Sequence, residues 1–150
     1  MDLTNGFKII GISIRTTNKD NQSAKDLSVL WGRFYAENII AKIPNKISDN
    51  VISLYTDYKS NYTDEYTTII GVAVSSLDEI PQGFIGREFK ADKFQQFIAK
   101  GKMPDAVVGI WMDIWQQDKE LNRKYSYDFE VYGEKCQAEI PEMEIFVAIR

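Results

Sequence analysis

The sequence predicts an α+β fold in which two long helices pack on a curved antiparallel sheet, built from duplicated β-α-β-β halves with pseudo-two-fold symmetry. Three observations indicate this fold: two hairpins with alternating apolar residues, two helical segments with an apolar stripe, and the same order of elements twice. The 150 residues fit one domain, residues 1–150, with pseudo-repeat halves at about 1–76 and 83–150. A junction between such halves is a common place for a ligand pocket.

The first half begins with an apolar strand over residues 7–15, and Gly11 within it indicates a bulge or a close approach of two backbones. Residues 22–40 have helical periodicity. Their apolar stripe consists of Leu27, Leu30, Trp31, Phe34 and Tyr35. Residues 51–59 and 66–75 alternate as strands and are separated by a polar turn, so we expect a hairpin.

The second half is expected to start with a strand over residues 84–91. Asp92 is a favoured N-cap residue, and we expect a short helix over residues 92–97. Residues 105–119 predict a longer helix. Its apolar stripe consists of Val107, Val108, Trp111, Ile114 and Trp115.

A second hairpin is expected from residues 127–132 and 143–149. Alternation in the first of these strands places Phe129 and Val131 on one face and Glu130 on the other. A glutamate on a strand is often only a solvated surface residue. The alternative is a carboxylate at the bottom of an aromatic cleft, with a pKa raised by desolvation, which meets a cationic and partly apolar ligand and releases a proton on binding.

The composition narrows the classes of function. Histidine is absent and Cys136 is the only cysteine, so the chain cannot form an internal disulfide, a zinc site or a Ser-His or Cys-His pair. We expect no cofactor and no metal. The net charge is −4 with scattered basic residues, which argues against direct nucleic-acid binding. No apolar run suggests membrane insertion or secretion, and we expect a cytoplasmic protein.

Several motifs together resemble the gyrase-inhibitor-like family, also known as bacterial transcription activator effector-binding domains. In chain order they are FKIIGISIRTTN, LWGRF, YTTIIGVAV followed by PQGF, FKADKFQQFIAKG, DFEVY and EMEIFVAI. The resemblance covers nearly the whole chain, and DFEVY is its most specific motif. It implies a ligand-binding domain that recognises cationic lipophilic compounds, here as a stand-alone member without a helix-turn-helix segment.

The resemblance also implies site residues. It places Glu130 in an aromatic pocket, with Phe146 of the last strand and Trp111 of the second helix as pocket residues. The chain departs from the family pattern at Phe94, where a tyrosine is common, and at Ala148, where a proline is common. The absent hydroxyl at Phe94 argues against the hydrolase activity described for some members.

Further aromatic residues are candidates for the walls of the pocket. Trp115 lies four residues after Trp111 and can point the same way, while Tyr58 and Tyr66 flank the turn of the first hairpin. For tryptophans at helical spacing, packing in the core is the common alternative, and exposure is the alternative for turn tyrosines. The predicted ligand-binding set is Glu130, Trp111, Phe146, Trp115, Tyr58 and Tyr66.

Three functions are compatible with these residues. The first, which we favour, is a non-enzymatic binding protein for cationic amphipathic small molecules, with a possible separate DNA-binding or protein partner. The second is a small-molecule hydrolase with Glu130 as general base, assisted by Tyr132 or Tyr66. The third is an interaction protein that docks on a macromolecule such as a topoisomerase through an acidic surface. That surface would consist of Asp113, Asp118 and Glu120.

Overall fold

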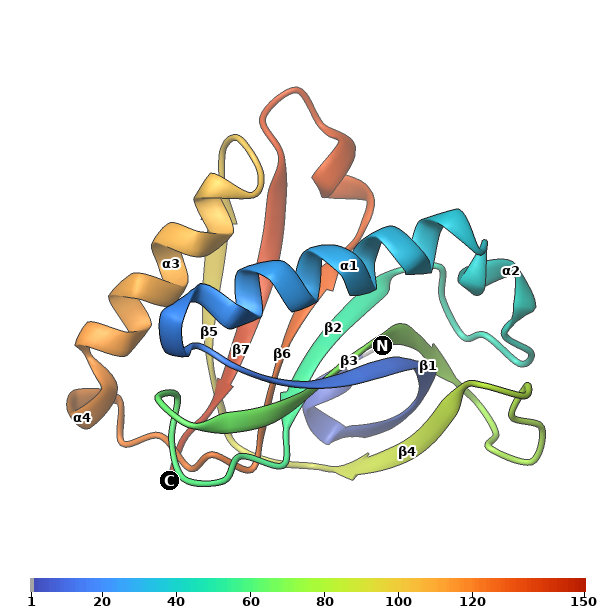
Figure 1. The fold of residues 1–150 in the computed structure, drawn as a ribbon, viewed down its shortest axis with the longest axis horizontal. Helices are drawn as coiled ribbons and strands as arrows, with labels where there is room; N and C mark the ends of the chain where they lie inside the picture. Colours follow the sequence, from blue (N-terminus) through green and yellow to red (C-terminus); the bar gives the residue numbers. More distant parts are fainter. Residues whose placement is uncertain (1) are drawn as a thin grey trace.

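Seven strands form one sheet in the computed structural model, which describes residues 2–150 (Figure 1). The strands are β1 (Gly6–Thr17), β2 (Val51–Thr56), β3 (Glu65–Val74), β4 (Ile85–Lys90), β5 (Phe94–Lys100), β6 (Tyr127–Tyr132) and β7 (Glu142–Ala148). The helices are α1 (Gln22–Ala36), α2 (Ile39–Lys42), α3 (Asp105–Gln116) and α4 (Asp118–Leu121). The strand order is β4-β1-β3-β2-β6-β7-β5, and all neighbours pair antiparallel. The predicted α+β class, with a single antiparallel sheet and two long helices, is confirmed.

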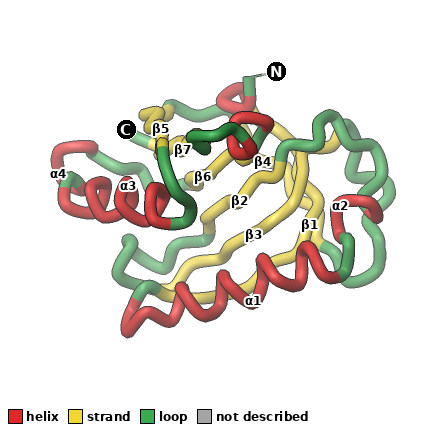
Figure 2. The backbone as a smooth tube through the Cα atoms, turned by 90° about the horizontal axis from the view of Figure 1, so that it is seen from above, coloured by secondary structure: helices red, strands yellow, loops and turns green. Residues whose placement is uncertain are grey.

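Both long helices cover the same face of the sheet (Figures 1 and 2). Leu30 and Phe34 of α1 pack on residues of β1 and β3, and Val107 and Ile114 of α3 pack on residues of β5 and β7. The central pair β2–β6 therefore lies between two separate helix-sheet cores. Tyr132 of β6 contacts both of them.

The opposite face of the sheet carries an aromatic core. The ring of Tyr127 in β6 lies 4.8 Å from that of Phe89 in β4 and 5.3 Å from that of Phe94 in β5. Because β4 and β5 are the two edge strands, these contacts require a sheet that curls until both edges approach its centre. The curved sheet therefore wraps around this aromatic core, and side chains from both edge strands fill its concave face.

The prediction of a helix over residues 92–97 is wrong, because residues 94–97 belong to strand β5. A spacing of three residues between Phe94 and Phe97 suits a helical stripe, but the two rings join cores on opposite faces of the sheet. The Asp92 carboxylate caps no helix; it accepts hydrogen bonds from Lys124 and Ser126. Seven residues of β5 pair with β7, so β5 takes the place in the second half that β1 takes in the first. The strand predicted at 84–91 exists as β4 and pairs with β1.

Gly11 and Gly71 are register partners where β1 and β3 cross closely, as the glycine in the first strand indicated. A Cβ atom on Gly11 would lie 2.0 Å from the carbonyl oxygen of Ile70. We therefore expect Gly11→Ala to lower the free energy of unfolding by about 2–3 kcal/mol, because two backbones must separate to admit the methyl group. Chemical denaturation measures this change.

Gly32→Ala is the matched control, since Gly32 lies in α1 and a Cβ there meets nothing within 4 Å. This substitution is expected to leave stability unchanged or to raise it by up to about 1 kcal/mol through helix propensity. Equal effects of the two substitutions would contradict the close crossing of β1 and β3.

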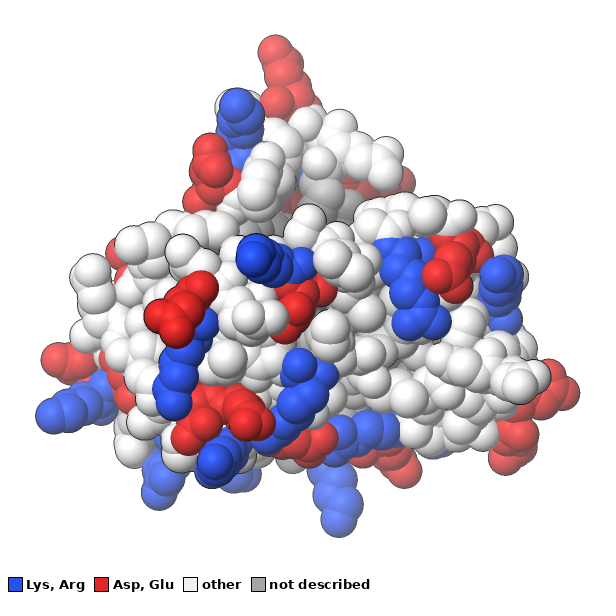
Figure 3. All heavy atoms as spheres, viewed as in Figure 1, with Lys and Arg blue, Asp and Glu red and all other residues white. Residues whose placement is uncertain are grey.

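The surface carries both signs of charge. Figure 3 shows basic and acidic side chains interspersed over the face that α1 crosses. No helix among residues 2–150 is both long and apolar enough to cross a membrane.

Candidate functional site

Glu130 lies in β6 on the face of the sheet that the helices cover. Its register partner in β7, Ile145, belongs to the core under α3, and Tyr132 packs against the cores of both helices. Phe129 points the other way, into the aromatic core. The alternation expected from the sequence thus places the Glu130 carboxylate in the region between α1 and α3.

Three neutral donors hold this carboxylate. The Trp111 indole nitrogen Nε1 of α3 donates to Oε2 at 2.6 Å, and the Tyr55 hydroxyl of β2 donates to the same oxygen at 3.0 Å. The Tyr132 hydroxyl donates to Oε1 at 2.6 Å. The carboxylate is therefore fixed from β2, β6 and α3 together, and its orientation depends on the packing of all three elements.

Glu130 is buried without a positive partner. Its exposed fraction is 2%, and within residues 2–150 no lysine or arginine forms an ion pair with it. Asp128, two residues earlier on the same face, is also buried but accepts from Arg123 Nη2 at 2.8 Å, from the Ala148 amide at 2.8 Å and from the Tyr58 hydroxyl. One carboxylate has a cation within the protein, and the other has none.

The electrostatic consequence is a carboxyl group that resists ionisation. Burial raises the pKa of Glu130, and the donors Tyr132, Trp111 and Tyr55 offset only part of that rise. Burial also raises the pKa of Tyr132 and of Tyr55, with a further contribution from the charge of Glu130. Both phenols stay protonated and act as hydrogen-bond donors. The three donors stabilise the ionised form in part, and neither phenol is an activated nucleophile.

Aromatic rings from five elements, β2, β3, β6, α1 and α3, surround the carboxylate. Tyr55 packs edge-on against Tyr66 at 5.9 Å and against Trp111 at 5.6 Å, measured between ring centroids. Trp31 of α1 packs edge-on against Tyr132 at 5.2 Å. Tyr66 is buried, and its hydroxyl donates to Oδ1 of Asn18, just after β1, at 2.9 Å. These rings lie around Glu130, whose exposed fraction is only 2%.

Two other predicted residues lie near this cluster. Trp115 stacks on Tyr62 of the β2–β3 turn, with centroids 5.6 Å apart and planes 7° from parallel. Tyr58 bonds Asp128 and lies 5.8 Å from the ring of Tyr66. The turn of the first hairpin therefore covers one end of the space between the helices.

Phe146 lies apart from the other predicted residues. It pairs with Phe129 in the β6–β7 ladder, stacks on that ring at 4.8 Å, and belongs to the aromatic core of the opposite face. The alternation of β7 explains this position, because Ile145 is the residue that shares the face of Glu130. We leave Phe146 out of the site proposed below.

Sequence reasoning missed three residues of this site. Tyr55 was not selected, although alternation along β2 and pairing of β2 with β6 bring Ser53 and Tyr55 beside Glu130 and Asp128. Trp31 was assigned to the helix stripe only. Arg123 gave no signal, since a single arginine before a strand is common in any sequence.

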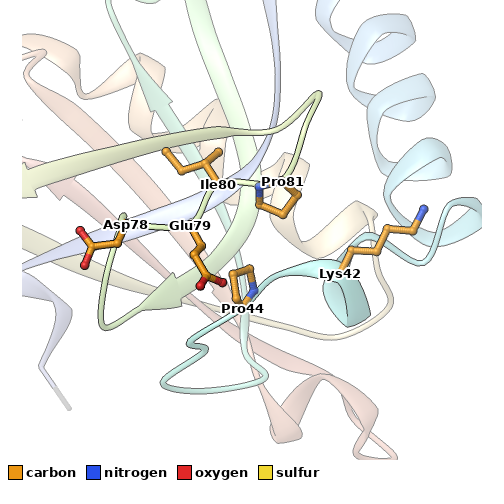
Figure 4. Close-up of a pocket in the computed structure, with 6 residues that line it drawn as sticks. All are labelled: Lys42, Pro44, Asp78, Glu79, Ile80 and Pro81. Carbon is orange, nitrogen blue, oxygen red and sulfur yellow. The ribbon is translucent and has the colours of Figure 1, made fainter.

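Two surface hollows lie away from Glu130. The first lies between the end of α2 and the β3–β4 connection and is lined by Lys42, Pro44, Asp78, Glu79, Ile80 and Pro81 (Figure 4). The second is lined by Gly101, Lys102, Met103, Cys136, Glu139, Ile140 and Pro141. Both are open to solvent, and Glu130 lines neither. We place the candidate site at Glu130 because the unpaired charge and its donors are there.

A curled antiparallel sheet with two helices on one face and a buried carboxylate between them defines an effector-binding fold of the gyrase-inhibitor-like type. The integron cassette protein VCH_CASS2 of Vibrio cholerae shares this fold with a TM-score of 0.77 and 30% identity, over 97% of this chain and 92% of that chain. SAV2435, solved bound to tetraphenylphosphonium, superposes with a TM-score of 0.78 at 20% identity, over 97% of this chain and 89% of that chain.

The chain belongs to the family described as Cass2, integron-associated effector binding protein, whose model matches residues 3–149. This family is gyrase-inhibitor-like, so the resemblance noted in the sequence is confirmed. A curated relative, YobU of Bacillus subtilis (strain 168), is 26% identical over 149 residues, which are 95% of this chain and 92% of that protein. Its name proposes a role as a transcriptional regulator.

Proposed function

We propose that this protein binds lipophilic cations, with Glu130 as the counter-charge and the surrounding rings as the apolar walls. The observation that carries the proposal is the burial of Glu130 at 2% exposure with neutral donors alone. A buried carboxylate without a cation costs several kcal/mol, and a bound cation offsets part of that cost. Each aromatic face that meets the cation adds roughly 0.5–2 kcal/mol.

The relatives support the same function. SAV2435 was solved with a phosphonium ion that carries four phenyl rings, and the family is described as effector binding. We propose the ligand-contacting set Glu130, Trp111, Trp115, Tyr58 and Tyr66, to which the site adds Trp31, Tyr55 and Tyr132. We further propose that a separate DNA-binding or protein partner reads the bound state, in line with the name of YobU. The binding role itself requires no catalysis.

Matched ligands test the proposal. Tetraphenylphosphonium is compared with triphenylphosphine oxide, a neutral compound with similar rings, by isothermal titration calorimetry. The cation should bind at least about tenfold more tightly, because only the cation compensates the buried charge. Equal affinities, or no binding of either compound, would overturn the proposal.

The affinity for tetraphenylphosphonium should also depend on pH. Burial raises the pKa of Glu130, so lowering the pH neutralises the counter-charge while the charge of the ligand is permanent. The affinity should fall by up to about tenfold per pH unit below the raised pKa, and binding above ordinary carboxyl pKa values should release protons. Titrations in two buffers with different ionisation enthalpies measure this release. An affinity that stays constant down to the ordinary carboxyl value of 4.5 would contradict the raised pKa of Glu130.

A further inference from the structure

Two carboxylates of β6 face the same side of the sheet but differ in their charge partners. Asp128 and Glu130 are two residues apart, which separates their Cα atoms by roughly 6.5–7 Å along the strand. The exposed fraction of Asp128 is 0% and that of Glu130 is 2%. Arg123 compensates the first, and neutral donors hold the second. When Glu130 is ionised, the two acids and the arginine together carry one uncompensated negative charge.

Arg123 borders the proposed pocket. Its side chain is 1% exposed, and its guanidinium carbon lies 4.3 Å from the ring centroid of Tyr125 and 5.8 Å from that of Trp111. Trp111 is also the residue whose indole nitrogen donates to Glu130 at 2.6 Å. The Trp111 side chain therefore contacts both the Arg123 guanidinium and the Glu130 carboxylate.

The third charge near Arg123 faces solvent. Asp118 lies 3.5 Å from Arg123 Nη1, on the α4 side, and its side chain is 27% exposed. Water screens such a carboxylate much more than it screens the fully buried Asp128. The charge available to a ligand inside the pocket is thus that of Glu130 alone.

From this geometry we propose that Arg123 restricts the pocket to cations with a single positive charge. The inference rests on the proposed function, and it deepens that function by naming the ligand class: monovalent lipophilic cations. Arg123 is a specificity-determining residue in this role, because it forms an ion pair with Asp128, the carboxylate that a second positive charge on the ligand would need.

The physical reason is the lack of a second counter-charge. The first charge of a ligand offsets the burial of Glu130. A second charge leaves water and meets the Asp128–Arg123 pair, which has no net charge and presents a guanidinium of the same sign. The net charge of −4 on the whole chain favours dications at long range, so a preference for monocations has to come from the pocket.

A pair of two-ring pyridinium ions tests this directly. N-methyl-4-phenylpyridinium carries one permanent charge, and methyl viologen has the same two-ring frame with two. Calorimetric titration of the wild-type chain should show the monocation binding at least about tenfold more tightly. Equal or tighter binding of methyl viologen would overturn the inference while leaving the proposed function intact. If neither the pyridinium monocation nor tetraphenylphosphonium binds, both fall.

Variants of the ion pair then assign the selectivity to Arg123. Arg123→Gln keeps an N–H donor for Asp128 but leaves the Asp128 carboxylate without its cation. This carboxylate can then meet the second charge of a dication, so the ratio of monocation affinity to dication affinity should fall by about tenfold. In the double variant Arg123→Gln, Asp128→Asn, positions 123 and 128 again carry no net charge. Its ratio of monocation affinity to dication affinity should therefore return to the wild-type value. A ratio that is the same in all three proteins would contradict the role of Arg123.

Asp128→Asn alone covers the case in which Arg123→Gln does not fold. This variant leaves the guanidinium without its buried partner, so methyl viologen should lose more affinity than the monocation and the ratio should rise. An unchanged or lower ratio in this variant would count against the inference. Circular dichroism confirms the fold of each protein before titration.

Discussion

Replacing Glu130 by glutamine is expected to weaken the binding of tetraphenylphosphonium by about 100-fold or more. Glutamine preserves the size of the side chain and can still accept from Trp111 and Tyr55, whose donors lie 2.6 and 3.0 Å from one carboxylate oxygen. The ring walls therefore stay, and the counter-charge alone is lost. Calorimetric titration of both proteins with the same ligand measures the difference.

Glu144→Gln is the matched control for this substitution. Glu144 lies in β7 opposite Val131, on the other face of the sheet, is half-buried, and accepts a hydrogen bond from Gln96 Nε2 at 3.0 Å. The same loss of one negative charge at this place should leave affinity within about twofold, because screened surface charges contribute little. If Glu130→Gln has no larger effect than Glu144→Gln, Glu130 is not the counter-charge.

Glu130→Gln should also stabilise the ligand-free fold near neutral pH. Burial raises the pKa of Glu130 in the folded state above its ordinary value of 4.5, so the folded chain retains a proton that the unfolded chain has lost. Stability then falls as the pH rises from about 4.5 through the folded-state pKa. Glutamine has no proton to lose. The stability gain of Glu130→Gln should thus be small at acidic pH and grow with rising pH, which denaturant titrations at several pH values can follow.

The face of the sheet on which Glu130 lies could be predicted from the sequence, because a strand imposes a period of two on its side chains. The neighbours of Glu130 were harder to predict. Tyr55 reaches the carboxylate through the pairing of β2 with β6, which joins the two hairpins across 70 residues or more, and no local pattern sets this register. Trp31 fits a helical core stripe equally well whether or not its ring also borders a site.

Two differences between the sequence predictions and the structure have a common physical origin. The spacing of Phe94 and Phe97 satisfies a helix by itself, and only the pairing of β5 with β7 shows that these rings point in opposite directions. Phe146 was assigned to the pocket by resemblance, although alternation in β7 places Ile145 on the face of Glu130. In both cases, two side chains can meet only if they lie on the same face of the sheet. The face of each side chain is fixed by the pairing of strands that are distant in the sequence.

Arg123→Met is expected to lower the free energy of unfolding by about 3–5 kcal/mol. The substitution keeps much of the apolar length of the side chain but leaves the Asp128 carboxylate, at 0% exposure, without its cation. The Ala148 amide and the Tyr58 hydroxyl remain as donors, and neither carries a compensating charge. Denaturant unfolding measured by circular dichroism gives this value.

A surface pair of similar geometry is the control. Arg87 lies 2.7 Å from Asp57, with side chains 37% and 47% exposed, and Arg87→Met should cost at most about 1 kcal/mol because water screens the pair. The double variant Arg123→Met, Asp128→Asn removes the uncompensated charge and should recover much of the loss. Additive losses in the double variant would show that Arg123 acts through packing on Tyr125 and Trp111 rather than through Asp128. A recovered double variant would instead show that Arg123 stabilises the fold chiefly by compensating the buried charge of Asp128.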